Sequence, residues 1–474
     1  MDKKRISILL LLIIISTLLE FKFANLSLTH IQGNWENNDQ TLQIPAAYRL
    51  SEDQYFVNDP VINEYIKIYP TLLFSLIAAV YNILSDMMLT YFILFLALKT
   101  VFVISAYLLA SLLLKNKNLA LLAAFLLAFT HFMGADEIGV SELLPKDFVF
   151  AFAPLILYLF LKDREKYSIP CFAGLGTLSY FHIFSIVPVL LMLSYSLISE
   201  KKYRLFLLSA LAFAAISSPF LFEKTAQGPE ATGEILQAVP YANLMSGLIT
   251  TAKYLPLIIL GFIVARKNNT EIFGWFLIIS IYSLSSLAGL FSEKILLFTL
   301  YRAYKYVIFF SFIFSAWFAG NLFKKNKAAG VLSVCILALY FSSIHYSTIF
   351  DGITKNMADY SRDIADAVAV GKWIDSNTGK NETFIAPPDW SILKPWAKRP
   401  IIFTESDQYI ISYSPSKFPD KNIYVEIKNA YKEKTSQRIF EIAKEKGIQI
   451  VVLYKSASGQ SIFQSGNFKI YRVS

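Results

Sequence analysis

The sequence predicts an α-helical polytopic membrane protein of about eleven spans, followed by a soluble α/β domain. Hydrophobic residues make up 55% of its 474 residues, more than the ~45–50% typical of a soluble domain. They are concentrated in runs of about 20 residues, which is enough to cross a hydrocarbon core ~30 Å thick. Basic residues stand in short clusters between these runs, as they do in cytoplasmic connectors. The net charge of +9 therefore reflects membrane topology. Because no basic stripe or recognition motif accompanies this charge, we do not expect nucleic-acid binding.

The N-terminal segment begins with Lys3, Lys4 and Arg5 and continues as an apolar run. No small-residue cleavage site follows, so we expect an uncleaved signal anchor with a cytoplasmic N-terminus. Both cysteines, Cys171 and Cys335, lie in apolar runs, which excludes a disulfide framework. The predicted spans are 6–25, 88–114, 119–133, 147–161, 168–182, 183–199, 205–222, 245–265, 271–290, 303–323 and 328–347.

One further apolar run, residues 66–84, decides the orientation of everything that follows it. If it crosses the membrane, every later basic connector lies outside. If it lies at the outer interface, all of them lie inside, in agreement with the positive-inside rule. These connectors are 115–117, 162–166, 201–204, 266–267 and 324–327. We therefore predict that 66–84 is an interfacial helix on the outer face of the cell (plasma) membrane.

This orientation divides the chain into a transmembrane domain, 1–347, and an extracytoplasmic domain, 348–474. It also places the first outer loop, 26–65, and the second outer loop, 134–146, outside. The extracytoplasmic domain is expected to alternate helices and strands around a largely parallel sheet. Its predicted elements are a helix at 357–375, strands at 383–386 and 400–403, a helix at 436–446 stopped by Gly447, and strands at 448–454 and 468–473.

Carboxylates gather in the two outer loops, where they could serve as a general base or hold a divalent cation. The first loop contains Glu36, Asp39, Glu52, Asp53, Asp59 and Glu64. The second region contains Asp136, Glu137, Glu142 and Asp147. No cofactor is required by these patterns, but Asp136 and Glu137 are the candidate ligands if Mg²⁺ or Mn²⁺ is used.

Two cations, Arg302 and Lys305, stand three residues apart at the predicted outer end of a span. Arg presents a fork that suits a phosphate, and Lys adds a point charge, so the pair is a candidate site for a lipid-linked phosphate. His182 lies where two predicted spans meet, at the outward tip of a helix pair, and is a further candidate for substrate binding. The sequence contains no HExxH motif and no phosphate-binding P-loop.

The order of these features resembles the C-type (GT-C) polytopic membrane glycosyltransferases. Two groups of residues carry the resemblance: the first-loop segment from Tyr48 to Pro60, and the start of the tail domain. The tail residues are Trp373–Thr378, Thr383–Pro388 and Lys398–Pro400. In this family an acid early in the first outer loop acts as the catalytic base or holds the substrate, and Asp39 matches that placement. The acidic pair that is common in the family is replaced here by Asn37-Asn38-Asp39-Gln40.

The resemblance implies transfer of a sugar from a polyprenyl-phosphate donor to a glycan, lipid or protein acceptor outside the cytoplasm. Asp39 would be the base, Asp53 and Asp59 would orient substrates or a cation, and Glu142 and His182 would bind substrate. Arg302 and Lys305 would neutralise the lipid phosphate. Two alternatives remain open: a carrier or flippase for a lipid-linked glycan, for which Lys99 would line the path, and a non-catalytic membrane assembly protein. Membrane lipids are partners in all three.

Overall fold

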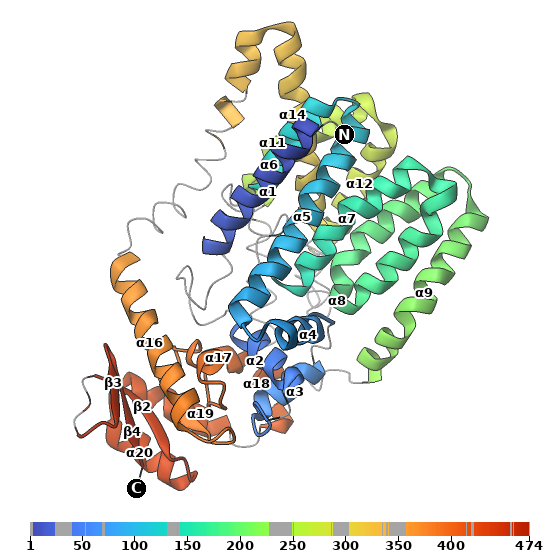
Figure 1. The fold of residues 1–474 in the computed structure, drawn as a ribbon. Coiled ribbons are helices and arrows are strands. Elements are labelled where there is room, and N and C mark those ends of the chain that lie inside the picture. The colour runs from blue at the N-terminus through green and yellow to red at the C-terminus, as the bar shows by residue number, and fades with distance from the viewer. Residues whose placement is uncertain are drawn as a thin grey trace. The chain divides into compact units, whose positions relative to one another are not determined.

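The computed structural model describes residues 3–23, 40–52, 54–68, 72–129, 140, 143–226, 249, 251–285, 287, 303–333, 335–337, 340, 357–413, 415–418, 421–455, 457 and 459–473 (Figure 1). Contacts divide the chain into two units. Unit 1 comprises residues 1–21, 91–223 and 237–351. Unit 2 comprises residues 22–90, 224–236 and 352–474. The first outer loop therefore groups with the C-terminal tail and not with the membrane helices.

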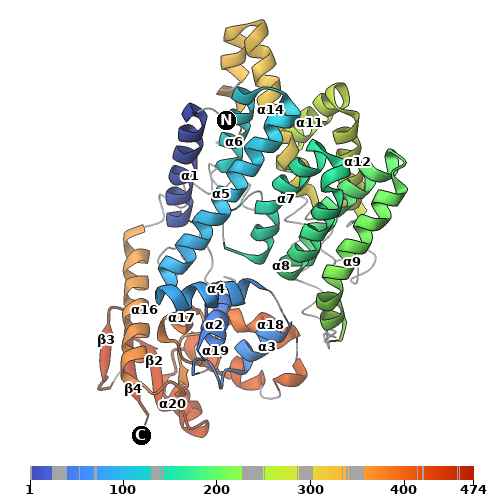
Figure 2. The ribbon, with the colours of Figure 1, turned by 45° about the vertical axis from the view of Figure 1, so that its right-hand side comes forward.

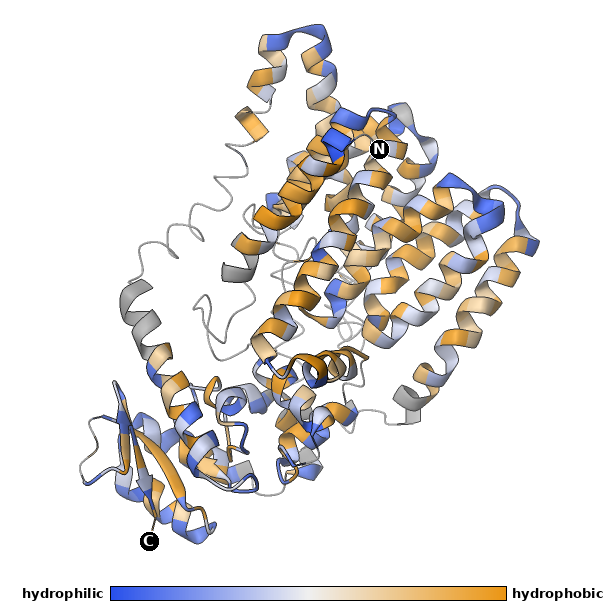
Figure 3. Ribbon diagram, viewed as in Figure 1, coloured by the Kyte–Doolittle hydropathy of each residue, from blue (hydrophilic) through white to orange (hydrophobic). Residues whose placement is uncertain are grey.

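Unit 1 is a bundle of apolar helices, and the short described connectors between them are polar (Figure 3). Its helices are α1 (Lys3–Phe23), α5 (Met87–Leu114, which starts in unit 2), α6 (Lys117–Ala128), α7 (Pro145–Lys162), α8 (Arg164–Ser199), α9 (Tyr203–Ala226), α11 (Leu255–Asn268), α12 (Thr270–Leu284) and α14 (Tyr304–Lys325). Four helices among the described residues are long and apolar enough to cross a membrane, or five if one bent pair counts as a span. The membrane class is thus confirmed, whereas the count of about eleven spans stays a prediction.

Helix α8 is a hairpin that bends at His182. An uninterrupted helix of its 36 residues would be about 54 Å long, so its two ends would lie far apart. Instead, Lys202 Nζ just beyond one end lies 2.8 Å from Glu165 Oε1 at the other, and Arg164 forms an ion pair with Glu200. The backbone of His182 is extended, with φ −157° and ψ 98°, and makes the reversal. The prediction that two helices meet at His182 is confirmed.

The basic connectors gather at one end of unit 1. The Arg5 guanidinium donates to Asn118 Oδ1 (3.1 Å), which joins the N-terminus to the connector before α6. Arg164 also pairs with Glu271, next to the 266–267 connector. Gly320 near the end of α14 gives room to the Leu119 side chain at the start of α6. The connectors therefore share one face, as the positive-inside rule requires. Which side of the membrane this face occupies stays a prediction.

The segment predicted as an interfacial helix forms two short helices, α3 (Pro60–Ile68) and α4 (Leu72–Leu84). Their axes differ in direction by 119°, so they do not form a straight span. Helix α4 alone is about 20 Å long, too short for a hydrocarbon core of ~30 Å. It buries Leu73, Phe74, Ile77, Ala78 and Tyr81 along one face and packs mainly on α2 (Gln40–Ser51). This geometry fits an interfacial helix, and its location at the membrane surface stays a prediction.

The C-terminal part of unit 2 contains a four-stranded sheet with helices on both faces (Figure 2). Its elements are α16 (Met357–Asn377), β1 (Phe384–Ile385), α17 (Leu393–Ala397), η5 (Glu405–Asp407), α18 (Gln408–Tyr413), η6 (Pro415–Lys417), α19 (Lys421–Lys432), α20 (Ser436–Glu445), β2 (Ile450–Tyr454), β3 (Phe463–Ser465) and β4 (Phe468–Arg472). Alternate residues of β2 face opposite sides, as a strand requires. Ile450 and Val452 pack with α16, whereas Val451 and Leu453 pack with α20.

The sheet is mixed, in order β1-β2-β4-β3, so the expectation of a largely parallel sheet is wrong. Strands β1 and β2 pair in parallel, because helices α17 to α20 supply the long crossover between them. Strand β4 pairs antiparallel to both β2 and β3. The described residues between β2 and β4 form turns and strand β3, which is too short a connection for a parallel return. Of the predicted strand at 400–403, only a single parallel bridge between Ile401 and Phe384 forms.

Candidate functional site

The first site candidate is a group of buried side chains in unit 1 at the start of α14. We call it the Lys305 cluster: Phe150, His182, Ser185, Lys305 and Tyr306. Lys305 is only 2% exposed, and its Nζ lies 5.9 Å from the centre of the Phe150 ring. Tyr306 also stacks on the Phe150 ring, and the centres of the two rings are 4.8 Å apart. An ammonium is thus held against an aromatic ring inside an apolar bundle.

His182 belongs to the same cluster through Ser185 and Tyr306. The Ser185 backbone N–H donates to His182 Nδ1 (3.2 Å), and Ser185 Oγ lies 2.8 Å from that nitrogen. The Tyr306 hydroxyl donates to the Ser185 carbonyl oxygen (2.8 Å). Because Nδ1 accepts, a neutral His182 ring carries its proton on Nε2 and is a hydrogen-bond donor there. A chain of contacts through Ser185, Tyr306 and Phe150 thus connects His182 with Lys305, two residues that were predicted separately.

The cluster lies at the end of unit 1 opposite the basic connectors. About 20 residues of α14 separate Lys305 from Lys325, which corresponds to about 30 Å of helix. The arm of α8 from Arg164 to His182 has a similar length. This distance is close to the thickness of a hydrocarbon core. The cluster and the connector end are therefore about one hydrocarbon thickness apart along these helices.

Lys99 on α5 is a second buried cation of unit 1, with 0% exposure. Its Nζ donates to the Val140 carbonyl oxygen (3.0 Å). The rings of Phe102 and Phe309 are 6.2 Å apart, where α5 meets α14. Lys99 and Lys305 each precede one of these rings by one turn, and both helices run toward the connector end. The two lysines therefore lie at about the same level along α5 and α14. In the sequence, Lys99 stood out because it is a lysine inside a predicted span.

Several predicted site residues lie outside the described part of the chain: Asp39, Asp53, Asp136, Glu137, Glu142 and Arg302. Their roles stay predictions. Asp147, an acid of the second outer region, is described: its Oδ2 accepts from the Leu144 N–H (3.3 Å) and caps α7. Among the described residues, no group of three or more His, Cys, Asp or Glu side chains is placed to hold a metal ion.

Asp59 is described, and it lies in unit 2 within a buried ion group that we call the Lys394 triad. Lys394 Nζ lies 3.0 Å from Asp59 Oδ2 and 2.9 Å from Asp407 Oδ1. The side chains of all three residues are at most 1% exposed. Asp59 in this arrangement faces a lysine in the protein interior and not an open substrate site. Sequence inspection missed Lys394 and Asp407, because nothing in their local pattern distinguishes them from surface charges.

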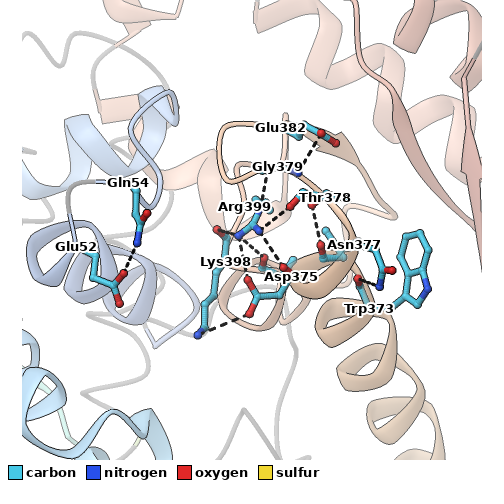
Figure 4. A network of polar contacts seen from close by, with 12 residues as sticks. Glu52, Gln54, Trp373, Asp375, Asn377, Thr378, Gly379, Glu382, Lys398 and Arg399 are labelled. Atoms are coloured by element: carbon cyan, nitrogen blue, oxygen red, sulfur yellow. Dashed lines mark hydrogen bonds and ion pairs between the residues drawn. The ribbon is translucent and has the colours of Figure 1, made fainter.

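A second polar network, within the tail domain, centres on Arg399 and Asp375 (Figure 4). Arg399 is buried and donates to Asp375 Oδ1 (3.0 Å) and to the carbonyl oxygens of Gly379 (2.9 Å) and Thr378 (3.0 Å). The neighbouring Lys398 reaches toward Asp375 Oδ2 (3.7 Å). Its Nζ lies 5.0 Å from the Tyr48 ring centre and 5.5 Å from that of Tyr55.

The fold as a whole is a GT-C-like membrane fold, as the family resemblance predicted. The structure of ArnT from Cupriavidus metallidurans bound to undecaprenyl phosphate matches with a TM-score of 0.55 and 9% identity. The match covers 100% of this chain and 99% of the ArnT chain. ArnT in the apo state gives 0.50 at 9% identity, over 99% and 98% of the two chains.

A weaker match is the oligosaccharyltransferase of Archaeoglobus fulgidus in complex with zinc and sulfate. Its TM-score is 0.44 at 13% identity, over 94% of this chain and 68% of that chain. No protein-family model matches this chain, and neither does the sequence of any curated protein.

Proposed function

We propose that this protein transfers a sugar from a polyprenyl-phosphate donor to an acceptor outside the cytoplasm. The observation that carries the proposal is a fold match over essentially the full length of both chains, to a structure that contains undecaprenyl phosphate. The buried cations of unit 1 support it independently, because a cation inside a membrane domain usually marks a substrate path or site.

Lys305 is the proposed ligand of the donor phosphate, together with Arg302 and with Lys99 at the same level of the bundle. In an apolar bundle an ammonium attracts a phosphate oxygen more strongly than it does in water, because the effective dielectric constant is lower. His182 would donate from Nε2 to the substrate, and Glu142 would bind it as well. Asp53 would orient the substrates or a cation, for which Asp136 and Glu137 are the proposed ligands.

The proposed reaction is a displacement at the anomeric carbon of the donor sugar. The acceptor hydroxyl oxygen forms the new bond to this carbon while its proton passes to the Asp39 carboxylate. The bond between the anomeric carbon and the phosphate oxygen breaks, and its electron pair leaves with the polyprenyl phosphate. This phosphate gains a negative charge as it departs, which is the charge that Lys305 would stabilise.

The test uses the purified protein with radiolabelled undecaprenyl-phosphate hexoses as donors and native membranes as the source of acceptor. Asp39→Asn keeps the side-chain shape but removes the base, so turnover should fall by ~10²–10⁴-fold while undecaprenyl phosphate binding persists. Lys305→Met removes a charge-assisted contact worth ~1.5–3 kcal/mol, so undecaprenyl phosphate binding should weaken by about 10- to 100-fold.

Lys162→Met is the matched control, because Lys162 is an exposed lysine at the connector end of α7. This variant should change neither turnover nor undecaprenyl phosphate binding. Full turnover by Asp39→Asn would contradict the role of Asp39. Undecaprenyl phosphate binding by Lys305→Met at the wild-type level would contradict the phosphate site. Movement of labelled donor across a vesicle bilayer without any transfer would favour the carrier alternative.

A further inference from the structure

Helix α17 of the tail domain directs two cations at the first-loop segment 40–68. Lys394 lies in its first turn, and Lys398 is its C-cap residue, four positions later, with a left-handed backbone (φ +49°). Lys394 contacts Asp59, the residue before α3, and Lys398 lies over Tyr48 on α2. Both partners come from the first-loop segment, so one short helix holds two points of that segment.

The Lys394 triad is rigid because each carboxylate has a second, fixed role. Asp59 Oδ1 accepts from the Ile62 N–H (2.9 Å) and caps the first turn of α3. Asp407 Oδ2 accepts from the Thr404 N–H (2.8 Å) and caps η5. A carboxylate that caps a helix with one oxygen can place its other oxygen in few positions, which fixes where Lys394 binds.

Helix α2 is built into the same packing. Every residue from Gln40 to Tyr48 is buried, and α2 packs against α17 and η5. Close to the triad, the Thr41 hydroxyl donates to Ser406 Oγ (2.8 Å) and links α2 to η5. Residues 40–51 therefore behave as a core element of unit 2 and not as a surface loop.

We infer that Lys394 is a positioning residue for the proposed transfer: its triad holds α2 and α3 on the tail domain, and with them the chain at Gln40, directly after Asp39. Lys394 is fully buried, so we expect it to act only through the position of this segment. The consequence for turnover rests on the proposed function, whereas the effect on α2 and α3 does not.

Removing Lys394 would leave two carboxylates facing each other without a counter-charge in the protein interior. Such a pair is more costly than the intact group, so α3 and η5 should separate or admit water. Replacing all three groups with neutral side chains of similar shape removes the repulsion. The variant Asp59→Asn, Lys394→Met, Asp407→Asn should therefore recover much of what Lys394→Met alone loses.

The experiment compares Lys394→Met, the triple variant and Lys428→Met in the full-length protein. Lys428 forms an ion pair with Glu405 in the same domain (2.8 Å) but is 49% exposed, so its loss should matter little. Hydrogen exchange reports on the amides of residues 40–51 and 60–68. Binding of undecaprenyl phosphate and turnover are measured in parallel.

In Lys394→Met, amide exchange in α2 and α3 should accelerate by at least about tenfold. Turnover should fall by about 10- to 100-fold, because small displacements of a reacting group are costly, while undecaprenyl phosphate binding persists. The triple variant should reverse most of both changes, and Lys428→Met should show neither. Unchanged exchange in Lys394→Met would overturn the inference, as would faster exchange with full turnover. Absence of transfer in the wild-type protein, with the exchange result intact, would instead refute the proposed function and with it the positioning role.

Discussion

Lys305 and Asp59 show how differently two charged residues of one predicted site can be used. Lys305 sits beside Phe150 in an apolar bundle, and Phe150 stacks on Tyr306, which is hydrogen-bonded to Ser185. Asp59 also lies in a buried environment, but its two oxygens are occupied by Lys394 and by the Ile62 N–H. The first residue fits a binding role, and the second fits a structural one.

Asp407 gives a prediction about pH. Burial raises the pKa of this carboxyl above its ordinary value of 3.8; Lys394 opposes the shift, and Asp59 adds to it. A folded-state pKa above the unfolded one means that the folded protein binds more protons in the interval between them. The stability contributed by Asp407 is therefore greatest at low pH and declines as the pH rises through that interval.

Asp407→Asn removes this titration while keeping a side chain of the same shape. We expect the free energy of unfolding of the variant to improve relative to wild type as the pH rises from about 4 to about 7. Thermal unfolding of both purified proteins across this range measures the difference. A difference that stays constant, or moves toward wild type, would show that Asp407 is not held with a raised pKa.

At the scale of elements, the end of α20 behaves as its sequence predicted. Gly447 adopts a left-handed backbone with φ +66°, and its N–H donates to the Lys444 carbonyl oxygen (3.2 Å). The following Ile448 N–H donates to the Ala443 carbonyl oxygen (2.8 Å), which completes a Schellman motif. The turn then delivers the chain directly into β2.

Gly447→Ala should destabilise the domain by roughly 1–2 kcal/mol, because an L-residue resists the left-handed backbone. No atom lies within 4 Å of the added Cβ, so the cost comes from the backbone alone. Asn tolerates this conformation better, and Gly447→Asn should lose clearly less. Urea unfolding followed by tryptophan fluorescence compares the two; equal losses would contradict the backbone explanation.

At the scale of the whole molecule, the basic connectors define one face of unit 1, and the positive-inside rule predicts that this face is cytoplasmic. In a background with both native cysteines replaced by serine, Lys117→Cys should not react with a membrane-impermeant maleimide in intact cells. Lys434→Cys, at an exposed position of the tail domain, should react. Labelling at position 117 but not at position 434 would reverse the orientation.

The sequence by itself determined the features that depend on neighbouring residues. Apolar runs predicted the helices, the basic clusters predicted their shared face, and Gly447 predicted a helix end, because hydropathy, charge and backbone preference act over a few residues. The bend at His182 followed from the length of its apolar run in the same way. The GT-C-like fold followed from the order of these features along the chain.

Only the tertiary structure decided which distant residues meet. Asp59 and Lys394 form an ion pair although they lie far apart in the sequence, and β2 pairs with β1 on one side and with β4 on the other. The pairing of His182 with Ser185 and Tyr306 likewise depends on how α8 packs against α14. The sequence alone offers a charged or hydroxyl side chain many possible partners. The packing of the chain selects one of them, because burial makes an unmatched polar group costly.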